Sequence, residues 1–398
     1  MHANTIFPPT RIEALTRLRD FTPCAGRDYA ARRNYDLGPG RHAGVSTLSP
    51  YIRTRLITEQ DVLQSVLAKF APSTAEKFIQ EVFWRTYWKG WLEMRPGVWR
   101  DYRQELGQQI NNIQTQSGLR RDWTAACQGE TGIDCFDAWA RELVQTGYLH
   151  NHARMWFASI WIFTLRLPWV LGADFFLRHL LDGDPASNTL SWRWVGGLHT
   201  QGKTYLARTS NISKYTEGRF HPKWQLASEA LPLKGSPNPD RQPLPDSDDI
   251  NPDLRTGLLL HPEDLSLAYL WEGCSPPQTV CILHSAHRLS PLHLAPHIKT
   301  FHAGALQDCV ARYDLSVDAT AQSAEDINTW IVAQGLDQVV TAYAPVGPSA
   351  DILAKLSRNS TARVVQVQRA FDQAAWPHAT HGFFRFKEHI PSLLKVII

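Results

Sequence analysis

The residues best suited to chemistry lie between His150 and Trp194. This stretch reads H-N-H-A-R-M, then a mostly apolar run, then L-L-D-G-D-P-A-S-N-T-L-S-W-R-W. Its polar members are Asn151, Arg154, Asp182, Asp184 and Asn188. Such groups are costly to bury without partners, so beside apolar helices they must satisfy one another or a polar ligand. Helix caps and a tryptophan-rich core are the structural alternative, but so many polar groups favour a ligand site.

Further motifs precede this stretch in a fixed order. They are Asp28-Tyr29 with Arg33, S-T-L-S-P-Y at 46–51, E-V-F-W-R at 81–85, and G-E-T-G at 129–132 with Asp137, Ala138 and Arg141. Together with H-N-x-x-R-M and D-G-D-x-A-x-N-x-x-x-W-x-W, they resemble the flavin-binding domain of the DNA photolyase and cryptochrome family. The resemblance extends over residues 10–222.

The resemblance implies a helical domain that binds FAD in a folded-over shape. Residues 46–49 would hold the pyrophosphate with hydroxyls and N–H groups at a helix start, where anions are favoured. Val45 and Thr47 stand where Thr and Arg are common, so we expect phosphate binding to be weaker or to use another cation. Arg154 and Asp182 would pair beside the isoalloxazine ring, and Asp184 would contact its edge. The residues assigned to FAD are Tyr29, Ser46, Thr47, Leu48, Ser49, Phe78, Glu81, Arg85, Tyr148, Asn151, Arg154, Asp182, Asp184, Ser187 and Asn188.

The same resemblance assigns catalytic roles. Asn188 matches the residue facing the flavin N5, where an amide suits a reduced, anionic flavin. Plant-type cryptochromes generally carry Asp there and animal-type ones Cys, so Asn favours repair. Trp192 and Trp169 match the proximal and middle members of a three-tryptophan chain that reduces the flavin, while Ala126 occupies the third position. Trp123 could substitute for the third tryptophan, or the path could branch through Trp139, Trp156 or Trp161. Packing in a tryptophan-rich core is the favoured explanation for each of these four residues taken singly.

Substrate residues also follow from the resemblance. Photolyases flip a pyrimidine dimer out of the duplex. Trp84 and Trp194 would stack on the lesion, and Glu81 would hydrogen-bond it and stabilise its radical anion. Met155 would line the lesion, and enzymes for the (6-4) photoproduct carry histidines at the positions of Asn151 and Met155. Their absence predicts the cyclobutane dimer as substrate. Phosphate contacts are assigned to Arg33 and Arg208.

The elements that must position these residues are helical in the first part of the chain. Residues 1–230 carry helical periodicity and little strand signal, so we predict an all-α domain there, and the resemblance implies that this domain is an FAD-binding helical bundle. A capping box at Ser73 and Glu76 predicts a helix start. Other helices are expected over 12–21, over 135–146, from His152, and from Asp174 to near Gly183.

A proline-rich, polar linker is predicted over 231–277, followed by a small α/β domain over 278–398. Strands are expected at 279–283, as the first strand, and at 338–343 and 363–367. Helices are expected at 303–313, 324–334 and 349–356. This alternation indicates a Rossmann-like domain with a mostly parallel sheet. Most relatives place such an antenna domain first, so the order is permuted. The domain is expected to be short by at least one strand–helix unit. Whether it binds an antenna chromophore, such as a folate or a deazaflavin, is left open by the sequence.

Composition places the chain among globular proteins, with 43% hydrophobic and 20% charged residues. Residues 1–230 hold 28 Lys and Arg against 21 Asp and Glu, which suits a phosphate backbone, although ordinary surface variation explains it equally. Six cysteines without a C-x-x-C pair indicate a reducing compartment. No signal peptide or membrane span is expected, which predicts a cytoplasmic protein. A monomer is also expected, although no motif in the sequence decides the oligomeric state. Five histidines, at 284, 287, 293, 297 and 302, fit no familiar metal spacing and are expected in loops.

We therefore interpret the sequence as that of a deoxyribodipyrimidine photolyase, which uses FAD and blue light to split cyclobutane pyrimidine dimers in UV-damaged DNA. The sequence does not decide between single- and double-stranded DNA as the substrate. A cryptochrome-like photoreceptor without repair activity is the alternative. A flavoprotein that has lost its photochemistry is a third possibility.

Overall fold

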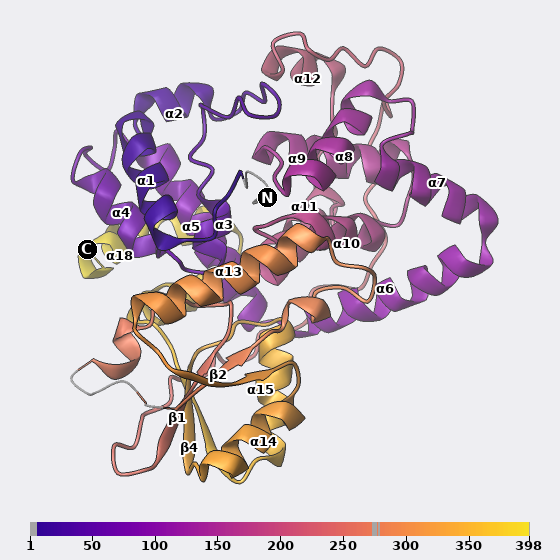
Figure 1. The fold of residues 1–398 in the computed structure, drawn as a ribbon. Coiled ribbons are helices and arrows are strands. Elements are labelled where there is room, and N and C mark those ends of the chain that lie inside the picture. The colour runs from indigo at the N-terminus through magenta and orange to yellow at the C-terminus, as the bar shows by residue number, and fades with distance from the viewer. Residues whose placement is uncertain (1–5, 273–276, 278, 398) are drawn as a thin grey trace, which may run out of the picture.

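The computed structural model describes residues 6–272, 277 and 279–397. Helices fill the first half of the chain and a parallel sheet with flanking helices follows, so the expected fold class is confirmed (Figure 1). The helices of the first half are α1 (Arg11–Phe21), α2 (Arg27–Arg32), α3 (Ser49–Arg53), α4 (Glu59–Leu67), α5 (Glu76–Glu93), α6 (Gly97–Thr115), α7 (Ser117–Gln128), α8 (Asp134–Thr146), α9 (Asn151–Ser159), α10 (Trp169–His179), α11 (Pro185–Val195) and α12 (Thr209–Tyr215).

Helices α10 and α11 form the centre of this half. α11 begins with Asp184 as N-cap, whose carboxylate accepts from the backbone N–H of Ser187 at 2.8 Å, and Pro185 follows at the first helical position. Gly172 on α10 makes room for the ring of Trp192 on α11, because a Cβ at Gly172 would lie 2.3 Å from that ring. The sequence thus sets two buried helices close together, with loop 182–184 between them.

Two expected helix starts are wrong, and one expected helix is not regular along its length. α5 begins at Glu76 after Ala75 and has no side-chain cap, so the predicted capping box at Ser73 does not form. The helix expected from Asp174 begins earlier, at Trp169 directly after Pro168, and ends at His179. α9 continues into a π-helical turn, Ile160–Thr164, instead of one regular helix.

The sheet has five parallel strands in the order β3-β2-β1-β4-β5. These are β1 (Thr256–Leu260), β2 (Thr279–Leu283), β3 (Val317–Ala321), β4 (Gln338–Ala342) and β5 (Arg363–Val367). The strand expected first is the second, because β1 lies inside the segment read as linker; β3 was not expected either. The helices between strands are α13 (Pro296–Arg312), α14 (Ala324–Gln334) and α15 (Pro348–Asn359). The proposed domain boundaries themselves stay predictions, and residue 278 lies outside the described residues.

The end of the chain returns to the helical half. The last helices are α16 (Ala370–Ala375), α17 (Phe383–Lys387) and α18 (Ile390–Ile397). α16 and α17 pack against α5, and α18 packs against α16 at the C-terminus (Figure 1). Phe371 and Phe386 contact Phe83 of α5, and a Cβ at Gly90 would lie 2.9 Å from Trp376. One continuous hydrophobic core therefore joins the two halves.

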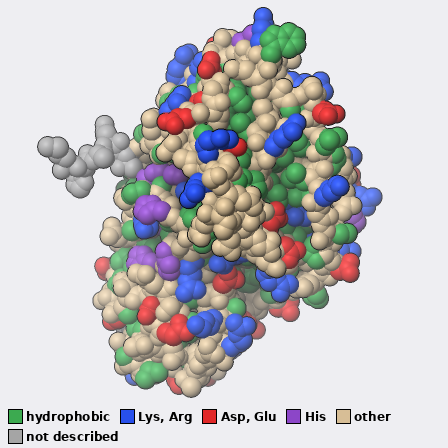
Figure 2. All heavy atoms as spheres, turned by 90° about the vertical axis from the view of Figure 1, so that its right-hand side faces the viewer, with side chains coloured by type: hydrophobic (Ala, Val, Ile, Leu, Met, Phe, Trp, Pro, Cys, Tyr) green, Lys and Arg blue, Asp and Glu red, His purple; other side chains and the backbone are tan. Residues whose placement is uncertain are grey.

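Surface features bear on several expectations. Basic and acidic side chains are interspersed on the face that Figure 2 presents, which is not the strongly basic surface that a nucleic-acid backbone favours. No helix among the described residues is long and apolar enough to cross a membrane. His297 and His302 lie on α13, not in loops, and no cluster that could hold a metal occurs in the described part of the chain. Cys274 lies outside the described residues, and the other five cysteines are free thiols.

Candidate functional site

Loop 182–184 carries two buried carboxylates. Arg154 of α9 donates through one terminal nitrogen to both oxygens of Asp182, each at 3.0 Å. Burial alone would raise the pKa of Asp182, but Arg154 and Arg85 outweigh burial and lower it. The pKa of Asp184 is likewise lowered, because Lys89, Arg53 and Arg85 outweigh its burial. Both aspartates are therefore anions at neutral pH.

Donors without partners surround Asp184. Lys89 Nζ lies 3.7 Å and Arg85 Nη1 4.0 Å from its Oδ2, too far for hydrogen bonds. Both nitrogens are buried and find no hydrogen-bond partner among the described residues, and the same holds for the hydroxyl of Ser187. Unpaired buried donors are costly. They fit a ligand rich in acceptor atoms, as the carbonyls and ring nitrogens of a flavin are.

Asn188 is oriented by a contact with α10. Its amide nitrogen donates to the carbonyl of Ala173 at 2.9 Å. Because only the NH₂ end can donate to a carbonyl, this contact fixes which end of the amide points to α10. The amide oxygen is left as the acceptor that Asn188 offers to a ligand.

Loop 46–49 has a cation that the sequence did not reveal. Arg17 of α1 donates to the hydroxyl of Thr47 at 3.3 Å and is held by Glu13 at 2.6 Å. Its guanidinium also lies over the rings of Phe7 and Tyr51, at 4.8 and 5.8 Å. The loop's own lack of an arginine was the only signal that a cation had to come from elsewhere. α3, which follows the loop, has only five residues, so side chains must supply most of any anion binding.

Helix α5 carries Glu81 and Trp84 near one another. Glu81 forms an ion pair with Arg33. Burial raises the pKa of Glu81, although Arg33 opposes this. The ring of Trp84 is stacked on Phe383 of α17, with centroids 3.7 Å apart and planes 13° apart. One face of the predicted lesion-stacking tryptophan is thus covered by a residue that the motifs did not indicate.

The other predicted substrate residues lie on separate elements. Trp194 stacks on Tyr205 at 5.7 Å, and among the described residues no ring contact joins Trp194 to Trp84. Met155 is half-buried on α9 and Arg208 is exposed. The structure brings the two tryptophans to neighbouring helices, since α5 and α11 are in contact.

The tryptophan chain is only partly assembled by direct contacts. Trp192 packs against Phe176 at 5.2 Å and against Trp161 at 6.2 Å. Its ring lies on Gly172, one turn along α10 from Trp169. Of the suggested branch residues, Trp161 contacts Trp192, whereas the other two stack on each other at 5.4 Å: Trp139 and Trp156.

Three helices therefore supply most of the assigned residues. α5 carries Phe78, Glu81, Trp84 and Arg85; α9 carries Asn151, Arg154 and Met155; and α11 with its preceding loop carries Asp182, Asp184, Ser187, Asn188, Trp192 and Trp194. Tyr29 of α2 makes an edge contact with Phe78 at 5.1 Å, and Tyr148 lies under Arg154 at 5.7 Å. The functional roles of these residues stay predictions.

Comparison with known proteins also indicates an FAD-binding domain. Residues 78–239 match the FAD binding domain of DNA photolyase. A deoxyribodipyrimidine photo-lyase of Alkalihalophilus pseudofirmus is 32% identical over 193 residues, covering 48% of this chain and 39% of that protein. One from Synechococcus is 28% identical over 254 residues, covering 58% and 51%. The chain thus matches about half the length of these relatives or less.

Solved structures with partial likeness include a class III photolyase from Agrobacterium tumefaciens, 26% identical with a TM-score of 0.44 over 53% of this chain and 44% of that one. The resemblance found in the sequence and the expectation of an FAD site are confirmed by the family match. Residues 78–239 therefore correspond to an FAD binding domain like that of DNA photolyase.

Proposed function

We propose that this protein is a light-driven photolyase that splits cyclobutane pyrimidine dimers in UV-damaged DNA. The observation that carries the proposal is the orientation of Asn188, whose NH₂ group is committed to Ala173 and whose oxygen is left to accept. An acceptor at this point suits a reduced flavin, which carries N–H at N5. The names of the curated relatives support the same activity.

The residues present fit FAD. Arg85, Lys89 and Ser187 offer buried donors to the ring system, and the pair of Arg154 with Asp182 lies beside them. Arg17 with the hydroxyls of loop 46–49 would hold the pyrophosphate. When bound and reduced, FAD would supply the light-excited electron donor, and the protein binds and orients it.

Glu81 and Arg33 form the part of the site that we assign to the lesion. A protonated Glu81 can donate to a carbonyl of a flipped pyrimidine, and burial favours that protonated form. Arg33, now paired with Glu81, can move to a DNA phosphate, which removes the charge that keeps Glu81 ionised. Trp84, which is half-buried, is the ring that we assign to stacking on a base.

A light-driven repair assay tests the proposal. Purified, photoreduced protein is mixed with a dimer-containing oligonucleotide, and intact pyrimidines are measured under blue light and in the dark. We expect light-dependent repair by the wild type and its loss in Glu81→Ala, with FAD still bound. Repair that survives in Glu81→Ala would contradict the role given to Glu81.

The second candidate is a cryptochrome-like photoreceptor, favoured by Phe383 covering one face of Trp84. Bound, photoreducible flavin without any repair in the same assay would favour that function.

A further inference from the structure

The FAD site is linked to the α/β domain by one buried arginine. Arg53, at the end of α3, is 1% exposed. Its Nε donates to the carbonyl of Gly183 at 3.0 Å, in the middle of loop 182–184. Its two terminal nitrogens donate to both oxygens of Glu263, at 2.6 and 3.1 Å. A single guanidinium therefore bridges the flavin loop and the α/β domain.

Glu263 is built into the α/β domain. It follows β1 by three residues, is 5% exposed, and also accepts from the hydroxyl of Ser349 at the start of α15, at 3.2 Å. Ser349 in turn lies 2.8 Å from Ser285, which follows β2. Glu263 is therefore held by groups at the carboxyl ends of two strands and cannot move without disturbing them.

The hydrogen bonds of Arg53 to its partners keep its guanidinium from binding Asp184. Its Nε lies 3.9 Å from Asp184 Oδ2, beyond hydrogen-bonding distance, because the guanidinium is committed to Gly183 and Glu263. Without the carboxylate of Glu263, Arg53 would be a buried cation lacking its bidentate partner, and Asp184 is a carboxylate within reach. Arg53 would then turn to Asp184 and release the backbone of Gly183.

We propose that Glu263 is a positioning residue of the FAD site, which holds Arg53 so that loop 182–184 is fixed and Asp184 stays available to the cofactor. This inference rests on the proposed placement of FAD beside Asp182 and Asp184. It makes the α/β domain a structural part of the cofactor site, whether or not that domain binds an antenna.

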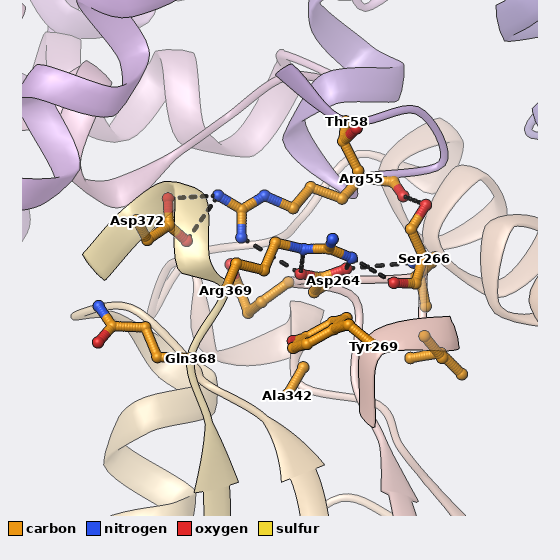
Figure 3. A network of polar contacts seen from close by, with 12 residues as sticks. Arg55, Thr58, Asp264, Ser266, Tyr269, Ala342, Gln368, Arg369 and Asp372 are labelled. Carbon is orange, nitrogen blue, oxygen red and sulfur yellow. Dashed lines mark hydrogen bonds and ion pairs between the residues drawn. The ribbon is translucent and has the colours of Figure 1, made fainter. Parts of the chain in front are cut away.

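The neighbouring residue provides a matched control. Asp264 is equally buried and pairs across the same domain boundary with Arg55 and, within its own domain, with Arg369 (Figure 3). In the described part of the chain, neither arginine hydrogen-bonds to loop 182–184. Glu263→Gln and Asp264→Asn each remove one buried carboxylate charge. Both should lower thermal stability, and only the first should change the FAD site.

The experiment compares the full-length variants by FAD titration of apoprotein, spectroelectrochemical midpoint potential and thermal unfolding. In Glu263→Gln we expect the FAD dissociation constant to rise about tenfold and the midpoint potential to become more positive, since a negative charge near the reduced flavin is lost. In Asp264→Asn we expect reduced thermal stability with FAD affinity and potential like the wild type.

Equal FAD affinity and potential in the two variants would overturn the inference. If Glu263→Gln does not fold, Glu263→Asp decides, because it keeps the charge but is too short to hold both nitrogens of Arg53. Wild-type FAD affinity and potential in Glu263→Asp would overturn the inference, and a weakened affinity would support it. A wild-type protein that fails to bind FAD would instead contradict the proposed function.

Discussion

At the scale of single residues, the site depends on charges that burial forces into pairs. The motif residues could be named from the sequence because their order and spacing are specific. Arg17 could not, because it lies 30 positions before the loop that it contacts and belongs to no motif. Phe383, which stacks on Trp84, could not be predicted either, because it belongs to no motif and reaches Trp84 only through the docking of α17.

Replacing Arg17 with Ala should weaken FAD binding. Charge-assisted hydrogen bonds contribute about 1.5–3 kcal/mol, so we expect the FAD dissociation constant to rise about tenfold or more. Titration of apoprotein with FAD measures this, and riboflavin, which lacks the pyrophosphate, should bind both proteins alike. Arg19→Ala on the same helix is the control, because Arg19 is exposed and pairs with its neighbour Asp20. Equal affinities of the Arg17 and Arg19 variants would remove Arg17 from the phosphate site.

The ionisation of Glu81 should be visible in the pH dependence of repair. Burial raises its pKa, so the protonated donor persists to higher pH than for an ordinary glutamate, and repair should decline as pH rises through that raised pKa. Arg33→Ala removes the charge that opposes the shift in the DNA-free protein, and should move the decline of kcat/KM, measured well below saturating DNA, to still higher pH. Glu81→Gln keeps a donor at every pH and should abolish the decline. A decline that persists unchanged in Glu81→Gln would assign it to another group.

At the scale of elements, the sequence predicted those with a clear pattern. The β-branched runs of β2 and β5 and the periodic α14 were located to the residue, because strong local preferences there agree with the fold. β1 was missed because its Thr-Gly-Leu-Leu-Leu run has one β-branched residue and follows a proline-rich stretch. The predicted cap at Ser73 failed because the chain forms a turn there before α5 begins.

The close contact between α10 and α11 predicts that adding one methyl group at Gly172 destabilises the protein. Gly172→Ala would place a Cβ 2.3 Å from Trp192 and 2.9 Å from Trp161. Overpacking costs about 1–3 kcal/mol, which exceeds the gain of up to about 1 kcal/mol from helix propensity. We therefore expect a lower free energy of unfolding and slower flavin photoreduction. A Cβ at Gly107 within α6 would meet no other described part of the chain within 4 Å, so Gly107→Ala should be neutral or stabilising. Equal denaturation curves for the two variants would show that Trp192 has room to move.

At the scale of the whole molecule, α5 serves both halves. It carries Glu81, packs on the C-terminal helices through Phe83 and Trp84, and reaches the α/β domain through Glu93. Local patterns predicted both halves but could not predict how they dock, because docking depends on contacts between residues some 250 positions apart. The same contacts couple the stability of the molecule to pH.

Glu93 should make the joint between the halves weaken as pH rises. It accepts from the Tyr343 hydroxyl and the Val346 N–H, both at 2.6 Å, and burial raises its pKa to about 7, although these hydrogen bonds oppose the shift. The folded state thus binds this proton more tightly than the unfolded chain, whose glutamate titrates near 4.5. Its stabilising contribution is complete below that value and is lost as pH rises through 7. The free energy of unfolding of the wild type relative to Glu93→Gln should fall by about 3 kcal/mol between pH 4.5 and pH 8. Urea unfolding of both proteins across this range measures the difference, and a difference independent of pH would mean that Glu93 stays ionised in the folded protein.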